Sequence, residues 1–312
     1  MDKLVCVVTG GTGGIGSAAV REMLASGYKV LFADVNAERN EAFKQELIAE
    51  GYTDVECMTC DVSDRVQCDA LAAKAKSMGK VQGLIHLAGL TPAFASYDAI
   101  VRVEAIGTLN MNEAFYQVME EGSSIMNISS QTAHMVPFDK YPTEIFDKAF
   151  TDRQAFYTEL CHFCKDLGDK MGGGQMPSNM AYTYSRCFIY WLCRNCCYAL
   201  GRRKGIKINT VSIGFCETPR SKADLEAGGL DYKERLAKMV ETTAFGRPGY
   251  PEEVAKVFEF LINPKNSYLS GIDILWDNGQ MANGHKGRGG FDPATRPYDP
   301  EKKFDVDYSK NY

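Results

Sequence analysis

The sequence predicts an α/β protein built on a Rossmann-type, doubly wound parallel sheet of about seven strands. Two observations lead to this fold class. Short apolar runs of strand length alternate with stretches of helical periodicity along most of the chain, a pattern typical of a parallel sheet covered by helices on both faces. The first run, at 5–9, is apolar without interruption and ends at a glycine-rich turn, as in a strand buried on both faces.

The expected elements follow one another regularly after that first strand. A helical pattern runs from Ala18 to Leu24 and is closed by Gly27, which suits the end of a helix. The next apolar run, at 29–34, is again of strand length. All of these elements belong to a single expected domain spanning the whole chain. Further strands, with helical stretches between them, are expected at 55–60, 83–87, 124–129, 207–212 and 271–275.

Two regions break this rhythm. Residues from about 135 to 177 stand where one short connection would suffice, and apolar residues such as Ile145 and Phe146 repeat there at helical spacing. We therefore expect a helical insertion. Residues from about 281 to 312 contain many glycines and prolines with mixed charges, a composition typical of an extended arm.

Charge and hydropathy argue against two classes of partner. With 35 Lys and Arg against 40 Asp and Glu, the net charge of −5 argues against nucleic acid, whose phosphates require a basic surface. The most apolar later stretch, at 188–200, is interrupted by Arg194 and Asn195 and is too short and polar to span a bilayer. The first apolar run has the length of a strand rather than of a secretory core, so we expect a cytoplasmic protein.

The eleven cysteines are interpreted as reduced structural thiols. Three pairs have CxxC spacing, at 57–60, 161–164 and 193–196, and the pair that encloses His162 is the best metal candidate. However, none of these pairs has a second pair at the sequence spacing that is usual in zinc ribbons or zinc fingers. The last pair lies on an apolar helical pattern, where cysteine packs as a small hydrophobic residue, so we expect no bound metal.

The glycine-rich turn after the first strand is the main indication of a ligand. Glycines permit a tight turn and let the backbone approach a pyrophosphate at the start of the next helix, where free N–H groups favour an anion. The strand before the turn and the helix after it are the context that a dinucleotide-binding motif requires, although such a turn also occurs for packing alone. The residues expected to contact the cofactor are Gly10, Thr12, Gly13, Gly14, Ile15 and Gly16.

The residue that ends the second strand selects the cofactor. Asp34 provides a carboxylate that accepts hydrogen bonds from the adenosine ribose diol and repels a 2′-phosphate. The next residues, Val35 and Asn36, offer no arginine to neutralise such a phosphate. We therefore predict NAD rather than NADP, with Asp34 and Val35 beside the ribose.

Further motifs occur in the order of one enzyme family, and over residues 3 to about 280 the chain resembles the short-chain dehydrogenases/reductases. Gly10, Gly14 and Gly16 fit that family's spacing. Gly10, Gly13 and Gly16 fit its extended, epimerase-like branch, but the later motifs favour the first. The resemblance implies further cofactor contacts from Asp61 and Val62, from Ala88 and Gly89 in a turn that lacks the family's asparagine, and from Ile213, Gly214 and Thr218.

The resemblance also implies the catalytic residues. The family's Tyr-x-x-x-Lys pattern falls on Tyr182 and Arg186, which lie one helical turn apart and so face the nicotinamide ribose together. Tyr182 is expected to be the general acid/base that exchanges a proton with the substrate oxygen. Ser130, which follows the fifth expected strand, would polarise that oxygen, and Glu104 stands at the position of the family's asparagine.

Two of these positions depart from the family pattern. Arg186 replaces the usual lysine; a guanidinium also binds ribose hydroxyls and favours an ionised tyrosine, but it does not readily release a proton. Glu104 replaces the usual asparagine. We hypothesise that the two changes compensate through an ion pair under the site, with Glu104 anchoring a relay water or carrying the proton. The alternative is that Glu104 points to solvent.

These features predict an NAD(H)-dependent oxidoreductase that interconverts a secondary alcohol and a ketone. The insertion after Ser130 resembles that of bacterial hydroxysteroid dehydrogenases and carbonyl reductases, so the expected substrate is a steroid or bile acid. Two alternatives stay open, a reductase of a non-steroid ketone and a catalytically silent NAD(H)-binding sensor. The apolar residues that would form a flat substrate cleft, or else pack the insertion, are Met135, Val136, Pro137, Phe138, Met176 and Phe215.

The resemblance further implies a homo-oligomer, either a dimer or a tetramer, whose usual interface the insertion displaces. The arm at 281–312 contains more aromatic residues than a free tail needs. It either extends freely or packs on the active-site face of its own subunit or on a neighbouring subunit.

Overall fold

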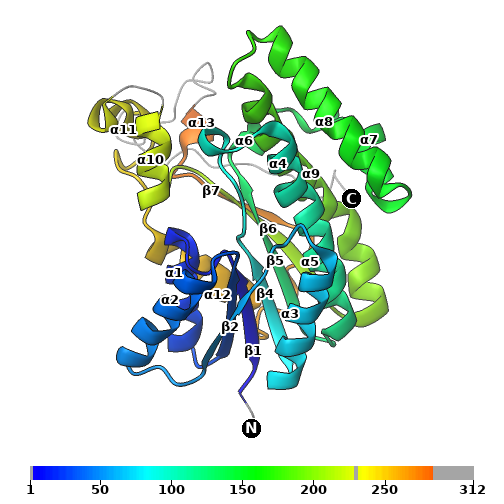
Figure 1. Cartoon of the computed structure of the whole chain (residues 1–312), viewed down its shortest axis with the longest axis vertical. Coiled ribbons are helices and arrows are strands. Elements are labelled where there is room, and N and C mark those ends of the chain that lie inside the picture. The colour runs from blue at the N-terminus through cyan, green and yellow to red at the C-terminus, as the bar shows by residue number, and fades with distance from the viewer. Residues whose placement is uncertain (1–2, 228–230, 284–312) are drawn as a thin grey trace, which may run out of the picture.

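Seven parallel strands form one sheet in the order β3-β2-β1-β4-β5-β6-β7 in the computed structural model, which describes residues 3–227 and 231–283 (Figure 1). The chain runs outward from β1 to β3, returns to β4 beside β1, and then continues on that side to β7. This is the doubly wound arrangement predicted from the sequence. The strands are β1 (Val5–Thr9), β2 (Lys29–Asp34), β3 (Val55–Thr59), β4 (Val81–His86), β5 (Ser124–Ser130), β6 (Lys207–Ile213) and β7 (Asp273–Trp276).

The last strand begins later than predicted. It was expected at 271–275 and is observed at 273–276. Gly271 adopts a φ of +78°, a left-handed conformation that does not continue a strand. Regular pairing with β6 therefore begins where Asp273 lies opposite Thr210.

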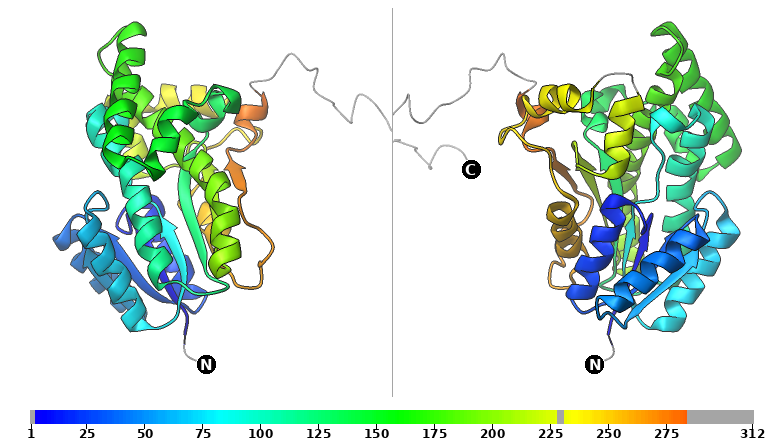
Figure 2. Two further views of the ribbon diagram at one scale, coloured as in Figure 1. Left: turned by 90° about the vertical axis from the view of Figure 1, so that its right-hand side faces the viewer. Right: turned by 60° about the vertical axis from the view of Figure 1, so that its left-hand side comes forward.

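Helices cover both faces of the sheet (Figures 1 and 2). Cys6 and Val8 of β1 point into one apolar layer, while Val5 and Val7 point into the other, which explains why this strand is apolar throughout. On the first face lie α1 (Gly14–Ala25), α2 (Ala37–Ala49) and α12 (Pro251–Ile262), and on the second lie α3 (Arg65–Met78), α5 (Gly107–Val118) and α9 (Met176–Lys204).

The segment predicted as a helical insertion, 135–177, is helical and shares an apolar core with the helices against which it packs. The long helix α8 packs along α9, and both contact α4 (Tyr97–Val101) (Figure 1). Phe146, Phe156 and Phe188 are fully buried between these helices. The segment contains or adjoins α6 (Thr132–Met135), η3 (Phe138–Lys140), α7 (Thr143–Asp147), η4 (Lys148–Phe150) and α8 (Arg153–Lys170).

The remaining elements flank the carboxyl ends of the strands. They are η1 (Pro92–Phe94), η2 (Arg102–Ile106), α10 (Pro219–Ala227), α11 (Tyr232–Val240) and α13 (Gln280–Asn283). Only the first residues of the arm predicted at 281–312 fall within the described ranges, in α13. The eleven cysteines are free thiols, most of them buried. Within 3–227 and 231–283, no helix has the length and apolarity to cross a membrane, and no three His, Cys, Asp or Glu side chains gather as metal ligands.

Candidate active site

The carboxyl ends of the strands meet along one edge of the sheet, where β1 and β4 lie side by side although the chain order reverses between them. The crevice outside such a switch point is where open α/β sheets bind ligands. The loops after β1, β4, β5 and β6, together with α9, enclose a cavity of about 270 Å³ at this edge. This cavity is the candidate active site.

The turn after β1 leaves no room for a side chain at Gly10, Gly14 or Gly16. Gly10 adopts a φ of +66°, and a Cβ on Gly16 would lie 2.0 Å from the carbonyl oxygen of Gly10. Across the cavity, a Cβ on Gly14 would lie 2.7 Å from the Cβ of Thr218. Because α1 begins at Gly14 without a side-chain cap, its first N–H groups suit a phosphate, so the site fits the pyrophosphate of a dinucleotide.

Asp34 ends β2 next to this turn, and its carboxylate is held in place. The Thr12 hydroxyl donates to Asp34 Oδ2 at 2.7 Å, and the Val35 N–H donates to Asp34 Oδ1 at 2.8 Å. An ionised carboxylate offers about four lone-pair positions, so acceptor capacity remains for the hydroxyls of a ribose. The two hydrogen bonds thus fix the orientation of the Asp34 side chain and leave acceptor positions available for a ligand.

Ser130 and Tyr182 line the same cavity although they are far apart in the sequence. Ser130 is the last residue of β5 and is 5% exposed. Its Oγ accepts the N–H of Thr132 at 3.3 Å. Tyr182 lies in the first part of α9, the helix that packs against β5. The sheet edge and this helix together place both hydroxyl groups at one ligand site.

Glu104 and Arg186 form a buried ion pair beside Tyr182. The Nη2 of Arg186 lies 2.9 Å from Oε1 and 2.8 Å from Oε2 of Glu104, and the two side chains are 7% and 1% exposed. Arg186 Nη1 also donates to the carbonyl of Ile128 at 2.9 Å, and the guanidinium lies 4.8 Å from the centre of the Tyr182 ring. Glu104 therefore points inward and pairs with Arg186, as hypothesised, and the alternative of a solvent-facing Glu104 is wrong.

The ionisation of this pair follows from burial and pairing. Burial raises the pKa of the Glu104 carboxyl, while Arg186 and the Leu90 N–H act in the opposite direction. Burial alone would lower the pKa of the Arg186 guanidinium, but the Glu104 charge and Tyr182 raise it above its ordinary value. Arg186 thus stays cationic, and Glu104 holds its proton more readily than an exposed glutamate does.

A widened helical turn and one glycine make room for the pair. Residues 102–106 form the π-helical turn η2, which places Glu104 inside the fold, where its Oε1 accepts the Leu90 N–H at 2.8 Å. A Cβ on Gly89 would lie 2.6 Å from Glu104 Oε1 and 3.0 Å from Arg186 Nη2. A side chain at position 89 would therefore require the ion pair to shift.

His86 lies next to this pair and was not predicted as a site residue. The Thr9 hydroxyl accepts the N–H groups of Leu87 and Ala88, so its proton is free for His86 Nδ1, 2.7 Å away. Burial, with a smaller contribution from the Arg186 charge, lowers the pKa of His86 to about 3. The imidazole is therefore neutral and carries its proton on Nε2.

Most of the predicted site residues meet at the cavity, and the others surround it. Ala88 lies behind the glycine turn, where its N–H bonds to the Thr9 hydroxyl, and Glu104 lies under Gly89. Five predicted residues lie outside the cavity, at the end of β2 or in the loops after β1, β2 and β3: Asp34, Thr12, Val35, Asp61 and Val62. The cavity is lined by Gly10, Gly13, Gly14, Ile15, Gly16, Gly89, Ser130, Tyr182, Arg186, Ile213, Gly214 and Thr218.

Four further polar residues line the cavity without having been predicted: Thr91, Arg220, Ser221 and Asp224. Arg220 Nε donates to the Thr91 hydroxyl at 3.0 Å, and that hydroxyl donates to Asp224 Oδ1 at 2.8 Å. Arg220 also lies 4.4 Å from the centre of the Phe94 ring. Burial raises the pKa of Asp224. These contacts join α10 to η1, and no sequence motif marks them because they depend on two loops meeting.

The apolar lining of the cavity differs from the one expected. Of the six residues predicted to form a substrate cleft, Phe215 lines the cavity in the described part of the chain. Met135 and Phe138 are 58% and 42% exposed, and Phe138 packs against Tyr190 instead. The other apolar walls come from the strand ends, at Leu87, Leu90, Ile128, Ile213 and Cys216.

Two family models match the sequence. The one described as short chain dehydrogenase matches residues 4–142, and the one described as enoyl-(acyl carrier protein) reductase matches residues 170–281. The residues between the two matches lie within the helical segment 135–177.

Individual relatives cover nearly the whole chain. A 3-alpha-hydroxysteroid dehydrogenase/carbonyl reductase of Comamonas testosteroni is 28% identical over 296 residues, which cover 94% of this chain and 98% of the relative. An L-rhamnose 1-dehydrogenase (NAD(P)(+)) of Azotobacter vinelandii is 27% identical, with 91% and 98% covered. A crystal structure of an actinorhodin polyketide ketoreductase with NADPH has a TM-score of 0.70 at 21% identity, with 90% of this chain and 98% of that chain covered.

Proposed function

Because the chain belongs to the short-chain dehydrogenase/reductase family and is an oxidoreductase of alcohol and ketone groups, we propose that it uses NAD(H) and acts on a steroid or bile acid. The observation that carries the proposal is the arrangement of Ser130, Tyr182 and Arg186 around the cavity that the glycine turn closes. When bound, the nicotinamide supplies or accepts the hydride. The glycine turn would bind the pyrophosphate through its backbone N–H groups, and side chains would move the proton and orient the substrate.

The preference for NAD rests on Asp34. Its carboxylate is fixed by Thr12 and Val35 at the end of β2, and a 2′-phosphate placed beside it would meet a like charge. The two residues that follow, Val35 and Asn36, carry no compensating charge. Titrating the purified protein with NADH and with NADPH, by nicotinamide fluorescence, tests this, and equal affinities would overturn it.

Tyr182 is the proposed general acid/base. Its hydroxyl would exchange a proton with the substrate oxygen, while the Ser130 hydroxyl donates a hydrogen bond to that oxygen. The Arg186 guanidinium lies 4.8 Å from the centre of the Tyr182 ring, which places a cation beside the proposed acid/base. Glu104, whose pKa burial raises, is placed to take up or return a proton behind Arg186.

The proposed substrate class is supported by one relative and by the walls of the cavity. A hydroxysteroid dehydrogenase is among the relatives, and Phe215, Leu87 and Leu90 offer apolar surface to a fused-ring substrate. A second candidate is a polar hydroxy substrate such as a sugar, because Thr91, Arg220 and Asp224 also line the cavity and a rhamnose dehydrogenase is another relative.

One assay separates the candidates. Purified protein is incubated with NAD and, in parallel, with hydroxysteroids, bile acids, aldoses and simple secondary alcohols, and NADH absorbance is followed. Turnover confined to the fused-ring compounds supports the proposal, and turnover confined to sugars supports the second candidate. Tyr182→Phe should abolish turnover while leaving NADH affinity unchanged; retained turnover would remove Tyr182 as the acid/base.

A homo-oligomer is also proposed, on the family resemblance alone. Light scattering coupled to gel filtration measures the mass directly, and a value near the 34.5 kDa of one chain would contradict it.

A further inference from the structure

The loop between β3 and α3, residues 60–64, lies where the adenosine half of the cofactor should reach. Neighbouring strands order the site: the glycine turn follows β1, Asp34 ends β2, and this loop follows β3. A dinucleotide with its pyrophosphate at the first turn and its ribose at Asp34 therefore brings its adenine to the loop. The Cys60 N–H donates to the Asp34 carbonyl at 3.1 Å, so the loop and the ribose site are directly connected.

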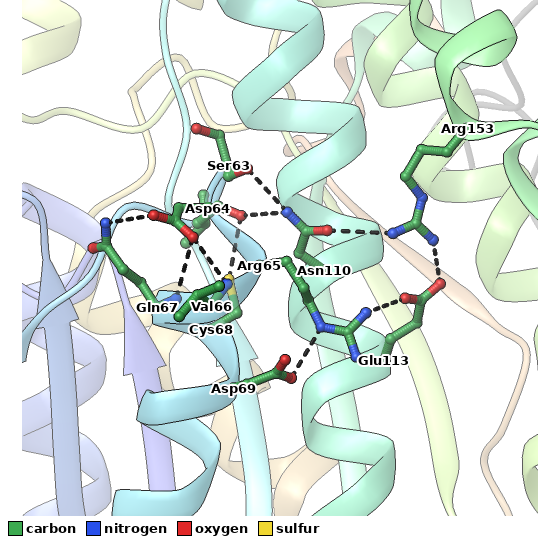
Figure 3. Close-up of polar contacts among 11 residues, drawn as sticks. Ser63, Asp64, Arg65, Val66, Gln67, Cys68, Asp69, Asn110, Glu113 and Arg153 are labelled. Carbon is green, nitrogen blue, oxygen red and sulfur yellow. Dashed lines mark hydrogen bonds and ion pairs between the residues drawn. The ribbon is translucent and has the colours of Figure 1, made fainter.

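Asn110 of α5 holds this loop from behind (Figure 3). It is 3% exposed, and its Nδ2 donates to the carbonyls of Val62 at 3.0 Å and Ser63 at 3.2 Å. The peptide between Val62 and Ser63 is planar and trans, so a carbonyl directed at Asn110 turns the Ser63 N–H the other way. That N–H donates to Asp61 Oδ1 at 2.9 Å. Asn110 thereby sets the orientation of the Asp61 carboxylate.

Arg153, the first residue of α8, fixes Asn110 in turn. Its Nη1 donates to Asn110 Oδ1 at 3.3 Å, which leaves the amide nitrogen of Asn110 facing the loop. Its Nη2 pairs with Glu113, and Glu113 also pairs with Arg65, the first residue of α3 (Figure 3). The helical segment 135–177 is thus linked through Asn110 to the middle of the loop, and through Glu113 to Arg65, which directly follows the loop.

We propose that Arg153 and Asn110 are positioning residues that fix the adenine-binding loop and thereby set the affinity for the adenosine half of the cofactor. The proposal rests on the proposed NAD(H)-dependent function. It gives the helical segment a role on the adenosine side, at the far end of the cofactor from Tyr182.

The role of Arg153 can be tested by substitution because other contacts hold α8 in position. Phe156 and Leu160 are fully buried in the apolar core of the segment, and Asp152 caps the helix by accepting the Ala155 N–H. The Arg153 side chain itself is 35% exposed. Its removal should therefore release the loop and leave α8 folded.

The experiment compares two reduced cofactors. NADH carries adenosine, and reduced nicotinamide mononucleotide lacks it, so only NADH should depend on the loop. Arg153→Met is expected to raise the Kd for NADH about fivefold. This corresponds to the upper end of the contribution that an ion pair between partly exposed side chains makes. Asn110→Ala, which leaves two carbonyls without their donor, is expected to raise it about tenfold. The KM for the mononucleotide and kcat at saturating NADH should stay unchanged in both.

A matched control lies in the same segment. Lys148→Met breaks the Lys148–Glu159 ion pair, which joins η4 to α8 within the segment, and should leave the affinity for both cofactors unaffected. In the Asn110→Ala background, Arg153→Met should raise the Kd for NADH by a smaller factor than it does in the unaltered protein, because part of the effect of Arg153 passes through Asn110.

Each outcome has a separate meaning. An unchanged NADH Kd in both variants, or equal weakening of NADH and the mononucleotide, overturns the positioning role. If the unaltered protein binds neither NADH nor AMP, the proposed NAD(H)-dependent function itself is refuted, and the positioning role is refuted with it. Tight NADH binding by the unaltered protein, with variants that behave like it, refutes the further inference alone.

Discussion

The buried pair of Glu104 and Arg186 gives the sharpest prediction. We predict that Glu104→Asn and Arg186→Lys each destabilise the protein, and that the double variant is destabilised by less than the sum of the two single effects. Glu104→Asn leaves a guanidinium that is 7% exposed, with the Ile128 carbonyl and Tyr182 as its remaining charge-stabilising partners. Arg186→Lys keeps a cation, but one ammonium does not span both Glu104 and the Ile128 carbonyl as the fork does. The double variant contains neither a guanidinium that has lost its carboxylate partner nor a carboxylate that has lost the guanidinium.

The magnitudes follow from burial. Removing one member of a buried ion pair costs about 3–5 kcal/mol, and we expect about 3 kcal/mol for Glu104→Asn because Arg186 keeps one acceptor. For Arg186→Lys, which retains the charge and loses one hydrogen bond, we expect about 1.5 kcal/mol. The double variant should fall short of the sum by about 2 kcal/mol, a coupling usual for residues in direct contact.

The assay is a double-mutant cycle on two quantities. Free energies of unfolding come from urea denaturation, and kcat comes from turnover of the best substrate at saturating NADH. Arg247→Lys, at a pair whose members are each 41% exposed, is the matched control and should cost less than about 1 kcal/mol. Additive free energies, or a Glu104→Asn variant as stable as the control, would refute the reasoning.

Three other changes have expected outcomes. Asp34→Ala should shift the ratio of NADH to NADPH affinity towards NADPH by about tenfold, measured by fluorescence titration, because a like charge is removed from the ribose site. Gly89→Ala should lower the free energy of unfolding by about 1–3 kcal/mol in urea melts, since its Cβ would lie 2.6 Å from Glu104 Oε1. Burial lowers the pKa of His86 from 6.5 to about 3, so the unfolded state binds more protons between these values and stability should fall as the pH drops below 6.5. His86→Asn should remove that part of the pH dependence, and urea melts on both sides of 6.5 would detect it.

The fold was predictable because its signals are local. The apolar run at 5–9 and the alternation of strand and helix patterns follow from which side chains each element buries, and the structure confirms the parallel sheet of seven strands. Strand ends were harder to predict. β7 starts at Asp273 because Gly271 takes a left-handed φ, and nothing in the sequence pattern requires that conformation.

The sequence by itself determined the residue types at the site: the glycine turn, Asp34, Ser130, Tyr182 and the paired changes at 104 and 186. The sequence reveals these residues because each belongs to a short motif, either at the end of a strand or on one face of a helix. The tertiary structure decided which contacts these residues make, including whether Glu104 meets Arg186 or points to solvent. Glu104 reaches Arg186 through a π-helical turn and a glycine on a third segment, and Arg220 reaches Thr91 across two loops. Such contacts join residues that are distant in the chain, and their geometry depends on how closely the backbones pack, which no periodicity in the sequence encodes.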